Sequence, residues 1–302
     1  MKGSIYGLIV GDALGVPVEF TPRHILERHP VSKMTGWGTH NQPPGTWSDD
    51  SSLMIATMDS ISQNKGLRYE DILNKFARWL YNSAYTATGS VFDVGRTTAN
   101  AIRNYISGVP AEYCGETDIR SNGNGSLMRI LPVVLFSRNE SPINLLKAVH
   151  KASALTHRHP ISLVGCGIYA LIAVNLMKGM KPEQAISVGY TTAESLYSKT
   201  YIEAFQKYRQ IKYLTALTRD EVSGSGYVVD TLVASLWCLL HTSTYRDAVL
   251  KAVNLGRDTD TVGAVTGSLA GMVHQVPVGW IKKLQNLGEV NRYVEQFSLI
   301  CT

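Results

Sequence analysis

The stretch GSIYGLIVGDALG, residues 3–15, places a glycine at every fourth position of an otherwise apolar run. A second run, GAVTGSLAG at residues 263–271, repeats this spacing near the other end of the chain. Residues four apart share one face of an α-helix, and each helical glycine costs about 1 kcal/mol relative to alanine. A whole face of glycines therefore indicates close helix contact, although tight packing alone needs no ligand. We predict two central helices that pack directly on each other.

Helical periodicity continues between these two runs. Apolar residues recur at spacings of three and four, for example at Ile72, Leu73, Phe76, Trp79 and Leu80. Convincing strand patterns are hard to find. Similar spacing predicts helices over residues 50–63, 143–154, 161–178, 182–198, 200–218, 228–241, 246–255 and 260–274. The sequence thus predicts an all-α fold, a single compact orthogonal helical bundle.

Length and composition narrow the function classes. The 302 residues contain no linker and no low-complexity segment, so we expect one domain over residues 1–302. The net charge is +5, but the basic residues are scattered, which argues against nucleic acid as the main ligand. The N-terminal apolar stretch, residues 5–10, is too short for a signal core. No apolar run approaches a membrane span by this reading, so no membrane is expected.

The four cysteines, Cys114, Cys166, Cys238 and Cys301, are far apart and form no Cys-x-x-Cys pair. Neither a zinc knuckle nor a disulfide framework is indicated, and a cytoplasmic location fits best. Cys166 and Cys238 lie within apolar helical patterns, where we expect small core residues.

Two acidic clusters lie at opposite ends of the chain. Trp47-Ser-Asp-Asp-Ser51 and Gly256-Arg-Asp-Thr-Asp-Thr261 each precede a helical pattern, which would place carboxylate and hydroxyl oxygens around helix N-termini. Hard divalent cations prefer such oxygen ligands. Plain helix capping is the alternative, because Ser and Asp are common caps. Four converging carboxylates would repel one another without a cation, so we favour a metal site.

Three loops, residues 21–47, 115–127 and 220–227, interrupt the helical pattern. Within the second, Gly123-Asn-Gly-Ser126 is followed by Leu127-Met-Arg129 and an apolar pair, as in a glycine loop running into a helix N-terminus. Backbone N–H groups there could cradle a diphosphate. The same residues are common turn formers, so the loop by itself leaves both readings open.

Together these segments resemble the ADP-ribosylglycohydrolases, metal-dependent (ADP-ribosyl)hydrolases that include the dinitrogenase-reductase-activating glycohydrolase. The matching segments follow the family order: Gly11–Gly15 with Glu19, Trp47–Asp50, Phe92–Gly95, Gly123–Arg129, Thr156–His157, Gly226–Tyr227 and Asp258–Thr261. The resemblance implies an all-helical fold whose central cleft holds two Mg²⁺ or Mn²⁺ ions. It also implies hydrolysis of the bond between ADP-ribose and an acceptor, with free ADP-ribose as product.

The resemblance also implies roles for individual residues. The metal ligands would be Ser48, Asp49, Asp50, Asp258, Asp260 and Thr261. The family usually has threonine at the position of Ser48, and serine keeps the hydroxyl. Arg257 stands where the family often has glycine, which would alter the rim of the cleft.

Glu19 matches a family glutamate implicated in catalysis, and Glu19 or a ligand aspartate, Asp50 or Asp260, would manage protons. By resemblance, the substrate would be bound by Asp93, Gly123, Asn124, Gly125, Ser126, Leu127, Met128, His157, Gly226 and Tyr227. Simpler readings exist for four of these residues. Glu19 and Asp93 could cap neighbouring helices, His157 could be a loop or capping residue, and Tyr227 could be a core aromatic whose hydroxyl reaches the surface.

Among acceptors, a protein arginine is the one we expect first, while serine and small-molecule linkages are alternatives. Three other classes compete with this reading. A metal-free glycoside hydrolase would use Asp50 and Asp260 as its carboxylate pair. A catalytically silent relative would bind ADP-ribose or act as a regulator, and a phosphodiester hydrolase would cleave a related dinucleotide.

Overall fold

A computed structural model describes residues 1–197, 199 and 201–301, and the all-α prediction is confirmed. Within these residues the chain forms α-helices and short 3₁₀ turns, with two isolated β-bridges and no strand. The α-helices are α1 (Lys2–Gly15), α2 (Arg23–Arg28), α3 (Asp49–Asn64), α4 (Tyr69–Asn82), α5 (Arg96–Ile106), α6 (Leu131–Phe136), α7 (Pro142–Ala154), α8 (Pro160–Met177), α9 (Pro182–Tyr197), α10 (Ile202–Gln206), α11 (Val228–Leu240), α12 (Tyr245–Val253), α13 (Thr259–Val273), α14 (Val278–Ile281) and α15 (Leu287–Ile300).

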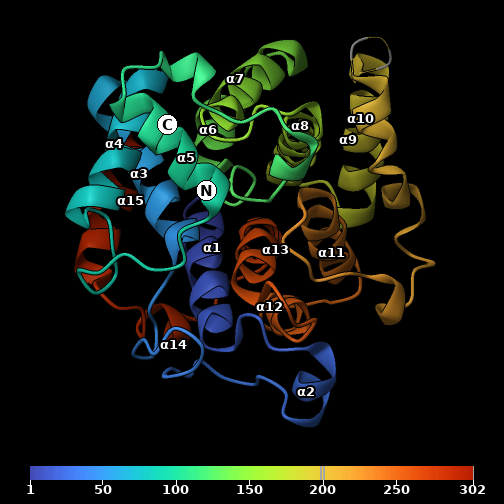
Figure 1. Cartoon of the computed structure of the whole chain (residues 1–302). Coiled ribbons are helices and arrows are strands. Elements are labelled where there is room, and N and C mark those ends of the chain that lie inside the picture. Colours follow the sequence, from blue (N-terminus) through green and yellow to red (C-terminus); the bar gives the residue numbers. More distant parts are fainter. Residues whose placement is uncertain (198, 200, 302) are drawn as a thin grey trace.

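Helices α1 and α13 lie side by side in the middle of the molecule, with α3, α4 and α15 on one side and α8 and α11 on the other (Figure 1). Their glycine faces meet backbone to backbone. A Cβ atom added at Gly11 would lie 2.1 Å from the carbonyl oxygen of Gly263, and one at Gly7 would lie 2.3 Å from that of Gly267. The predicted glycine contact is confirmed. Since α1 and α13 begin or end beside the acidic clusters, this contact sets the geometry of the site.

A side chain at this contact should be costly. Gly11→Val should lower the free energy of unfolding by about 3 kcal/mol or more, because its branched side chain has to separate the two central helices. Urea unfolding of the variant measures this loss. Gly288→Val is the matched control, since Gly288 is also helical but a Cβ there would meet nothing within 4 Å. Equal stability of the two variants would contradict the packing argument.

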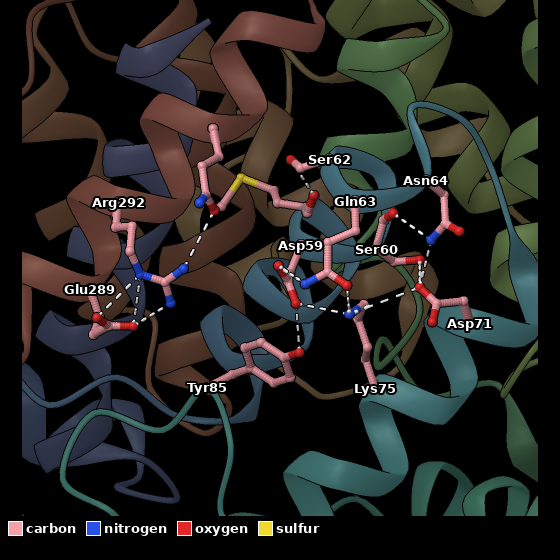
Figure 2. Close-up of polar contacts among 12 residues, drawn as sticks. Asp59, Ser60, Ser62, Gln63, Asn64, Asp71, Lys75, Tyr85, Glu289 and Arg292 are labelled. Carbon is pink, nitrogen blue, oxygen red and sulfur yellow. Dashed lines mark hydrogen bonds and ion pairs between the residues drawn. The ribbon is translucent and has the colours of Figure 1, made fainter.

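The far end of α3 is anchored by buried polar contacts that the sequence analysis did not single out (Figure 2). Lys75 of α4 donates to Asp59 of α3 at 2.9 Å and to Gln63 at 3.0 Å, and the Tyr85 hydroxyl donates to Asp59 at 2.8 Å. Asp59 and Lys75 are both buried. Losing one partner of such a pair strands a buried charge. The network therefore fixes the helix whose N-terminus carries the first acidic cluster.

One predicted helix was wrong. Residues 201–218 form the short α10, a 3₁₀ helix at Arg209–Tyr213 and turns, while residues 198 and 200 lie outside the described residues. The buried residues Phe205, Tyr208, Ile211 and Leu214 recur every three positions, which is the 3₁₀ period. The Tyr208 hydroxyl donates to the carbonyl oxygen of Ile161 at 2.7 Å. Burial of this row bends the chain out of α-helical geometry.

Other helix predictions hold with boundaries shifted by one or two residues, as at α3, α7, α11 and α13. The loop predicted over residues 21–47 contains the short α2. Cys166 and Cys238 are buried in α8 and α11, which confirms their core positions.

Helix α8 corrects the expectation about apolar runs. Its 18 residues are long and apolar enough, by length and composition, to cross a membrane. In the structure 83% of this segment is buried inside the protein, against α7, α9 and α11. A core helix of a large bundle reaches the same hydropathy because it is apolar all round.

Candidate active site

The N-terminus of α3 is capped from another helix. Asp12 of α1 accepts hydrogen bonds from the backbone N–H of Ser48 at 2.9 Å and of Ser51 at 3.1 Å, and from the Ser51 hydroxyl at 2.5 Å. Ser48 is the N-cap, and its Oγ accepts from the Asp50 N–H at 3.3 Å. Asp12 and Ser48 thus satisfy the N–H groups of Ser48, Asp50 and Ser51. The side chains of Asp49 and Asp50 are left for another role, so capping does not account for them.

The N-terminus of α13 has the same character. Asp258 is at the N-cap position but makes no side-chain capping bond, and its Oδ2 accepts from the Asn124 side chain at 2.9 Å. Asp260 Oδ1 accepts from the Thr261 N–H at 2.9 Å. Asp50 Oδ2 accepts from the Ser48 hydroxyl of its own cluster at 2.9 Å and from the Thr261 hydroxyl of the second cluster at 3.3 Å. The two acidic clusters therefore meet, as the sequence predicted.

Three buried carboxylate oxygens have no hydrogen-bond partner among the described residues, namely Oδ1 of Asp50, Oδ1 of Asp258 and Oδ2 of Asp260. Buried polar atoms are rarely left without a partner. The carboxylates form two groups in which one oxygen from each residue lies within 4.8 Å of the others: Asp12, Asp50 and Asp260, and Glu19, Asp258 and Asp260. Only oxygen ligands are offered, which suits a hard divalent cation. The residues present therefore fit a metal site, and Asp260 belongs to both groups.

Burial and mutual repulsion raise the pKa of these acids. The pKa values of Asp49, Asp50 and Asp260 lie well above the usual range, first because of burial and then because of neighbouring carboxylates. Burial raises the pKa of Asp12 to about 6 and that of Glu19 to about 7. Asp49 is buried beside the two groups but belongs to neither. Bound cations would remove this strain.

These shifts predict a pH effect on the metal-free protein. A carboxyl whose folded-state pKa is raised binds more protons folded than unfolded, so its contribution to the free energy of unfolding falls as pH rises above about 4. Burial lowers the pKa of His150 to about 4 and that of His157 to about 3, which acts in the opposite direction. The informative quantity is therefore a difference between two proteins.

In EDTA, Asp50→Asn should gain stability over wild type as pH rises from 5.5 to 8, by at least about 1 kcal/mol. Urea unfolding at each pH measures the difference. The same comparison with saturating Mg²⁺ should show no such gain, because the wild-type carboxylates are then neutralised. A difference that stays constant with pH would contradict the proposed repulsion.

The glycine loop lies against the segment before α11. The N–H of Asn124 donates to the carbonyl oxygen of Gly226 at 3.0 Å, and Gly123 forms an isolated β-bridge with Tyr227. A Cβ at Gly226 would lie 2.7 Å from Asp258 Oδ2, so glycine allows the approach to the acidic cluster. Residues 123–126 and 226–227, which are far apart in the sequence, are thus both brought to the acidic clusters.

His157 lies under this loop. It is buried, its Nδ1 is 2.8 Å from the Thr156 hydroxyl, and a Cβ at Gly125 would lie 2.9 Å from its ring. The capping alternative was wrong for His157, because His159 caps α8 by accepting from the Ile161 N–H at 3.2 Å. The imidazole is neutral at physiological pH because burial lowers its pKa, and it packs against the loop at Gly125.

The loop itself differs from the expected geometry. Residues 125–129 form turns, and α6 begins only at Leu131. The side chains of Ser126, Leu127 and Met128 are buried, and Ser126 accepts from the Ser153 hydroxyl at 2.8 Å. Contact with a substrate would come from the loop backbone. The role of Ser126, Leu127 and Met128 in substrate binding remains a prediction.

The alternatives for Asp93, Tyr227 and Glu19 were wrong. Gly95, not Asp93, is the N-cap of α5, and Asp93 has a positive φ of 52°. Tyr227 is 36% exposed, so it is no core aromatic. Glu19 is buried and forms a hydrogen bond with His40 rather than capping a helix. Asp93, Glu19 and His40 each have one ligand atom within 4.8 Å of the others.

Sequence reasoning missed His40 and the capping role of Asp12. A single histidine in a glycine- and proline-rich loop carries no spacing signal, and Asp12 lies in the matching segment Gly11–Gly15 without a role of its own. Arg257 is exposed and has a φ of 68°. Glycine adopts this left-handed conformation without strain, whereas arginine rarely does. Arg257 lines a cavity of about 460 Å³ beside α2. Its effect on the rim of the cleft remains a prediction.

The family model described as ADP-ribosylglycohydrolase matches residues 1–301. The chain belongs to the ADP-ribosylglycohydrolase family. An ADP-ribosylarginine hydrolase of Serratia proteamaculans is 32% identical over 98% of this chain and 78% of the relative. An ADP-ribosyl-[dinitrogen reductase] glycohydrolase of Rhodospirillum rubrum is 32% identical over 93% of this chain and 89% of the relative. A solved "ADP-ribosylglycohydrolase-related protein complex" has 28% identity and a TM-score of 0.81, covering 99% of this chain and 97% of that one.

This ADP-ribosylglycohydrolase is therefore an enzyme that hydrolyses the glycosidic bond between ADP-ribose and an acceptor. The family is metal-dependent, and the buried acidic groups could hold metal. This finding sets aside the catalytically silent reading and the metal-free glycoside hydrolase.

Proposed function

We propose that this ADP-ribosylglycohydrolase releases ADP-ribose from arginine side chains of ADP-ribosylated proteins, with two Mg²⁺ or Mn²⁺ ions in the cleft. The observation that carries the proposal is the meeting of Asp50 and Asp260, from opposite ends of the chain, with partnerless buried oxygens. Two overlapping groups of acids that share Asp260 suit two neighbouring ions. Asp12 is not counted as a ligand because its oxygens cap α3, and Glu19 is reserved for proton transfer. The proposed ligands are Ser48, Asp49, Asp50, Asp258, Asp260 and Thr261.

The reaction breaks the bond at C1 of a ribose through a transition state with oxocarbenium character. When bound, the ions supply positive charge that polarises ribose oxygens and the attacking water. Asp50 and Asp260 hold this charge in place. Glu19 lies beside these ligands, where its carboxyl group would serve as general acid or base. In the metal-free protein burial raises the pKa of Glu19 to about 7.

The acceptor side favours a cation. Asp93 and Glu19 lie together beside the acidic clusters, and a guanidinium forms strong charge-assisted hydrogen bonds with carboxylates. A serine acceptor would bring no charge to this position. Two relatives are named ADP-ribosylarginine hydrolases, which supports the same assignment.

The nucleotide half would lie on the other side of the metal site. The backbone of residues 123–125 would contact the diphosphate, and Tyr227 would contact the nucleotide with its half-exposed ring. We also propose a single domain over residues 1–302 in the cytoplasm, where four unpaired buried cysteines stay reduced. Its partners would be ADP-ribosylated proteins rather than membranes or nucleic acids.

The test uses arginine-linked and serine-linked ADP-ribosylated proteins, each with Mg²⁺, Mn²⁺ or EDTA. Mass spectrometry identifies the released nucleotide. We expect metal-dependent release of intact ADP-ribose from the arginine linkage only. Release from serine alone would overturn the acceptor assignment, and release of AMP would indicate a phosphodiester hydrolase.

A further inference from the structure

His40 is joined to Glu19 at the edge of the acidic clusters. Its Nε2 is in hydrogen-bond contact with Oε2 of Glu19, which is the one side-chain hydrogen bond of Glu19 to any described residue. The other oxygen, Oε1, accepts nothing from a described residue and is not among the atoms sealed from solvent. One oxygen of Glu19 is therefore restrained, and the other has no hydrogen-bond partner among the described residues.

The imidazole is itself held in place. The preceding residue, Thr39, donates its hydroxyl to the backbone carbonyl of Glu19 at 2.7 Å, so the loop is tied to the segment it serves. The centroid of the His40 ring lies 5.1 Å from that of Phe92 and 6.0 Å from that of Phe20. The histidine side chain is only 14% exposed. A ring confined in this way can fix the position of its partner.

Glu19 needs such a restraint because no other described side chain holds its carboxylate. One of its oxygens belongs to the group with Asp258 and Asp260, and it also lies beside Asp93. A functional side chain keeps its productive geometry only when supporting hydrogen bonds and packing hold it. Among the described residues, His40 is the side chain that supplies this hydrogen bond.

We propose that His40 is a positioning residue for Glu19: its hydrogen bond holds the carboxylate so that the free oxygen stays directed at the ribose being cleaved. The inference rests on the proposed function and deepens it by adding a residue outside the motifs that define the family resemblance. His40 acts through Glu19 and touches no reacting atom.

Kinetics of the metal-loaded enzyme on arginine-linked substrate provide the first test. His40→Ala should lower kcat by ~10–100-fold, the usual loss for a residue that orients an active-site group. KM should change less than about threefold, because substrate binding does not use the bond. His40→Gln should recover most of the lost kcat, since its amide nitrogen can donate to Glu19. His29→Ala, at an exposed histidine of the same loop region, should match wild type.

An unchanged kcat in His40→Ala, or a His40→Gln variant as impaired as the alanine variant, would overturn the proposal. Crystal structures of the metal-loaded variants supply a readout that needs no turnover. The Glu19 carboxylate should shift by more than about 1 Å in His40→Ala and keep its place in His40→Gln. An unmoved Glu19 would overturn the positioning role. Absence of ADP-ribose release by wild type would instead overturn the proposed function, and the structures would still decide the role of His40.

Discussion

Asp260→Asn and Asp50→Asn should each lower kcat/KM for ADP-ribose release by ~10³-fold or more. Each substitution keeps the side-chain volume but removes a charge from the set that would hold the cations, so stabilisation of the transition state is lost. Asp260 belongs to both acidic groups and Asp50 to one, which makes Asp260 the more severe loss. Initial rates of ADP-ribose release under saturating Mg²⁺ measure the effect.

Unfolding would not explain such a loss. In EDTA both variants should be at least as stable as wild type at pH 7.5, because each removes one of several mutually repelling carboxylates. Asp247→Asn is the matched control, since Asp247 is exposed in the first turn of α12 and accepts from the Thr244 hydroxyl. It should keep wild-type activity. Rates within about threefold of wild type for Asp260→Asn would refute the metal-ligand assignment.

Removal of metal should have an effect of the same size. EDTA should abolish ADP-ribose release, and added Mg²⁺ or Mn²⁺ should restore it, because the acidic groups are organised around positive charge that the protein itself does not provide. The metal should also stabilise the fold. A ligand at 100 times its dissociation constant adds about 2.7 kcal/mol to the free energy of unfolding. Thermal unfolding with and without metal tests this.

The metal-induced stabilisation also tests where the metal binds. The metal-induced rise in Tm should be largely lost in Asp260→Asn and retained in Asp247→Asn. A rise in Tm that persists in Asp260→Asn would place the ions elsewhere. Full activity in EDTA would return the enzyme to a mechanism with two carboxylates and no metal.

Much of the fold follows from local patterns in the sequence. Apolar spacing predicted most of the long helices. The glycine faces of α1 and α13 predicted a contact between two segments far apart in the sequence, because close backbone packing is what offsets the helix destabilisation by so many glycines. The composition of the acidic clusters predicted that they lie close together for a similar reason. Each cluster supplies more oxygen atoms than a helix cap uses, and a shared cation would account for the excess. In both cases the residues of one segment indicate what it must contact: a second helix backbone for a glycine face, and a cation for an acidic cluster.

Tertiary contacts decided the rest. The row Phe205, Tyr208, Ile211 and Leu214 became irregular because burial against α8, α9 and α11 outweighed helix propensity, which is worth less than about 1 kcal/mol per residue. The buried pair of Asp59 and Lys75 has no signature in either helix alone, since each residue reads as a surface charge until its partner is in place.

The active site divides in the same way. The sequence by itself indicated the acidic side chains and the glycine loop, because residue type and order are enough to recognise a candidate ligand set for a hard cation. Only the tertiary structure decided that Asp12 caps α3 from α1 and so frees Asp49 and Asp50, and that His40 restrains Glu19. Both roles depend on hydrogen bonds between residues more than twenty positions apart, and such bonds are specified by how the helices pack, not by any local pattern.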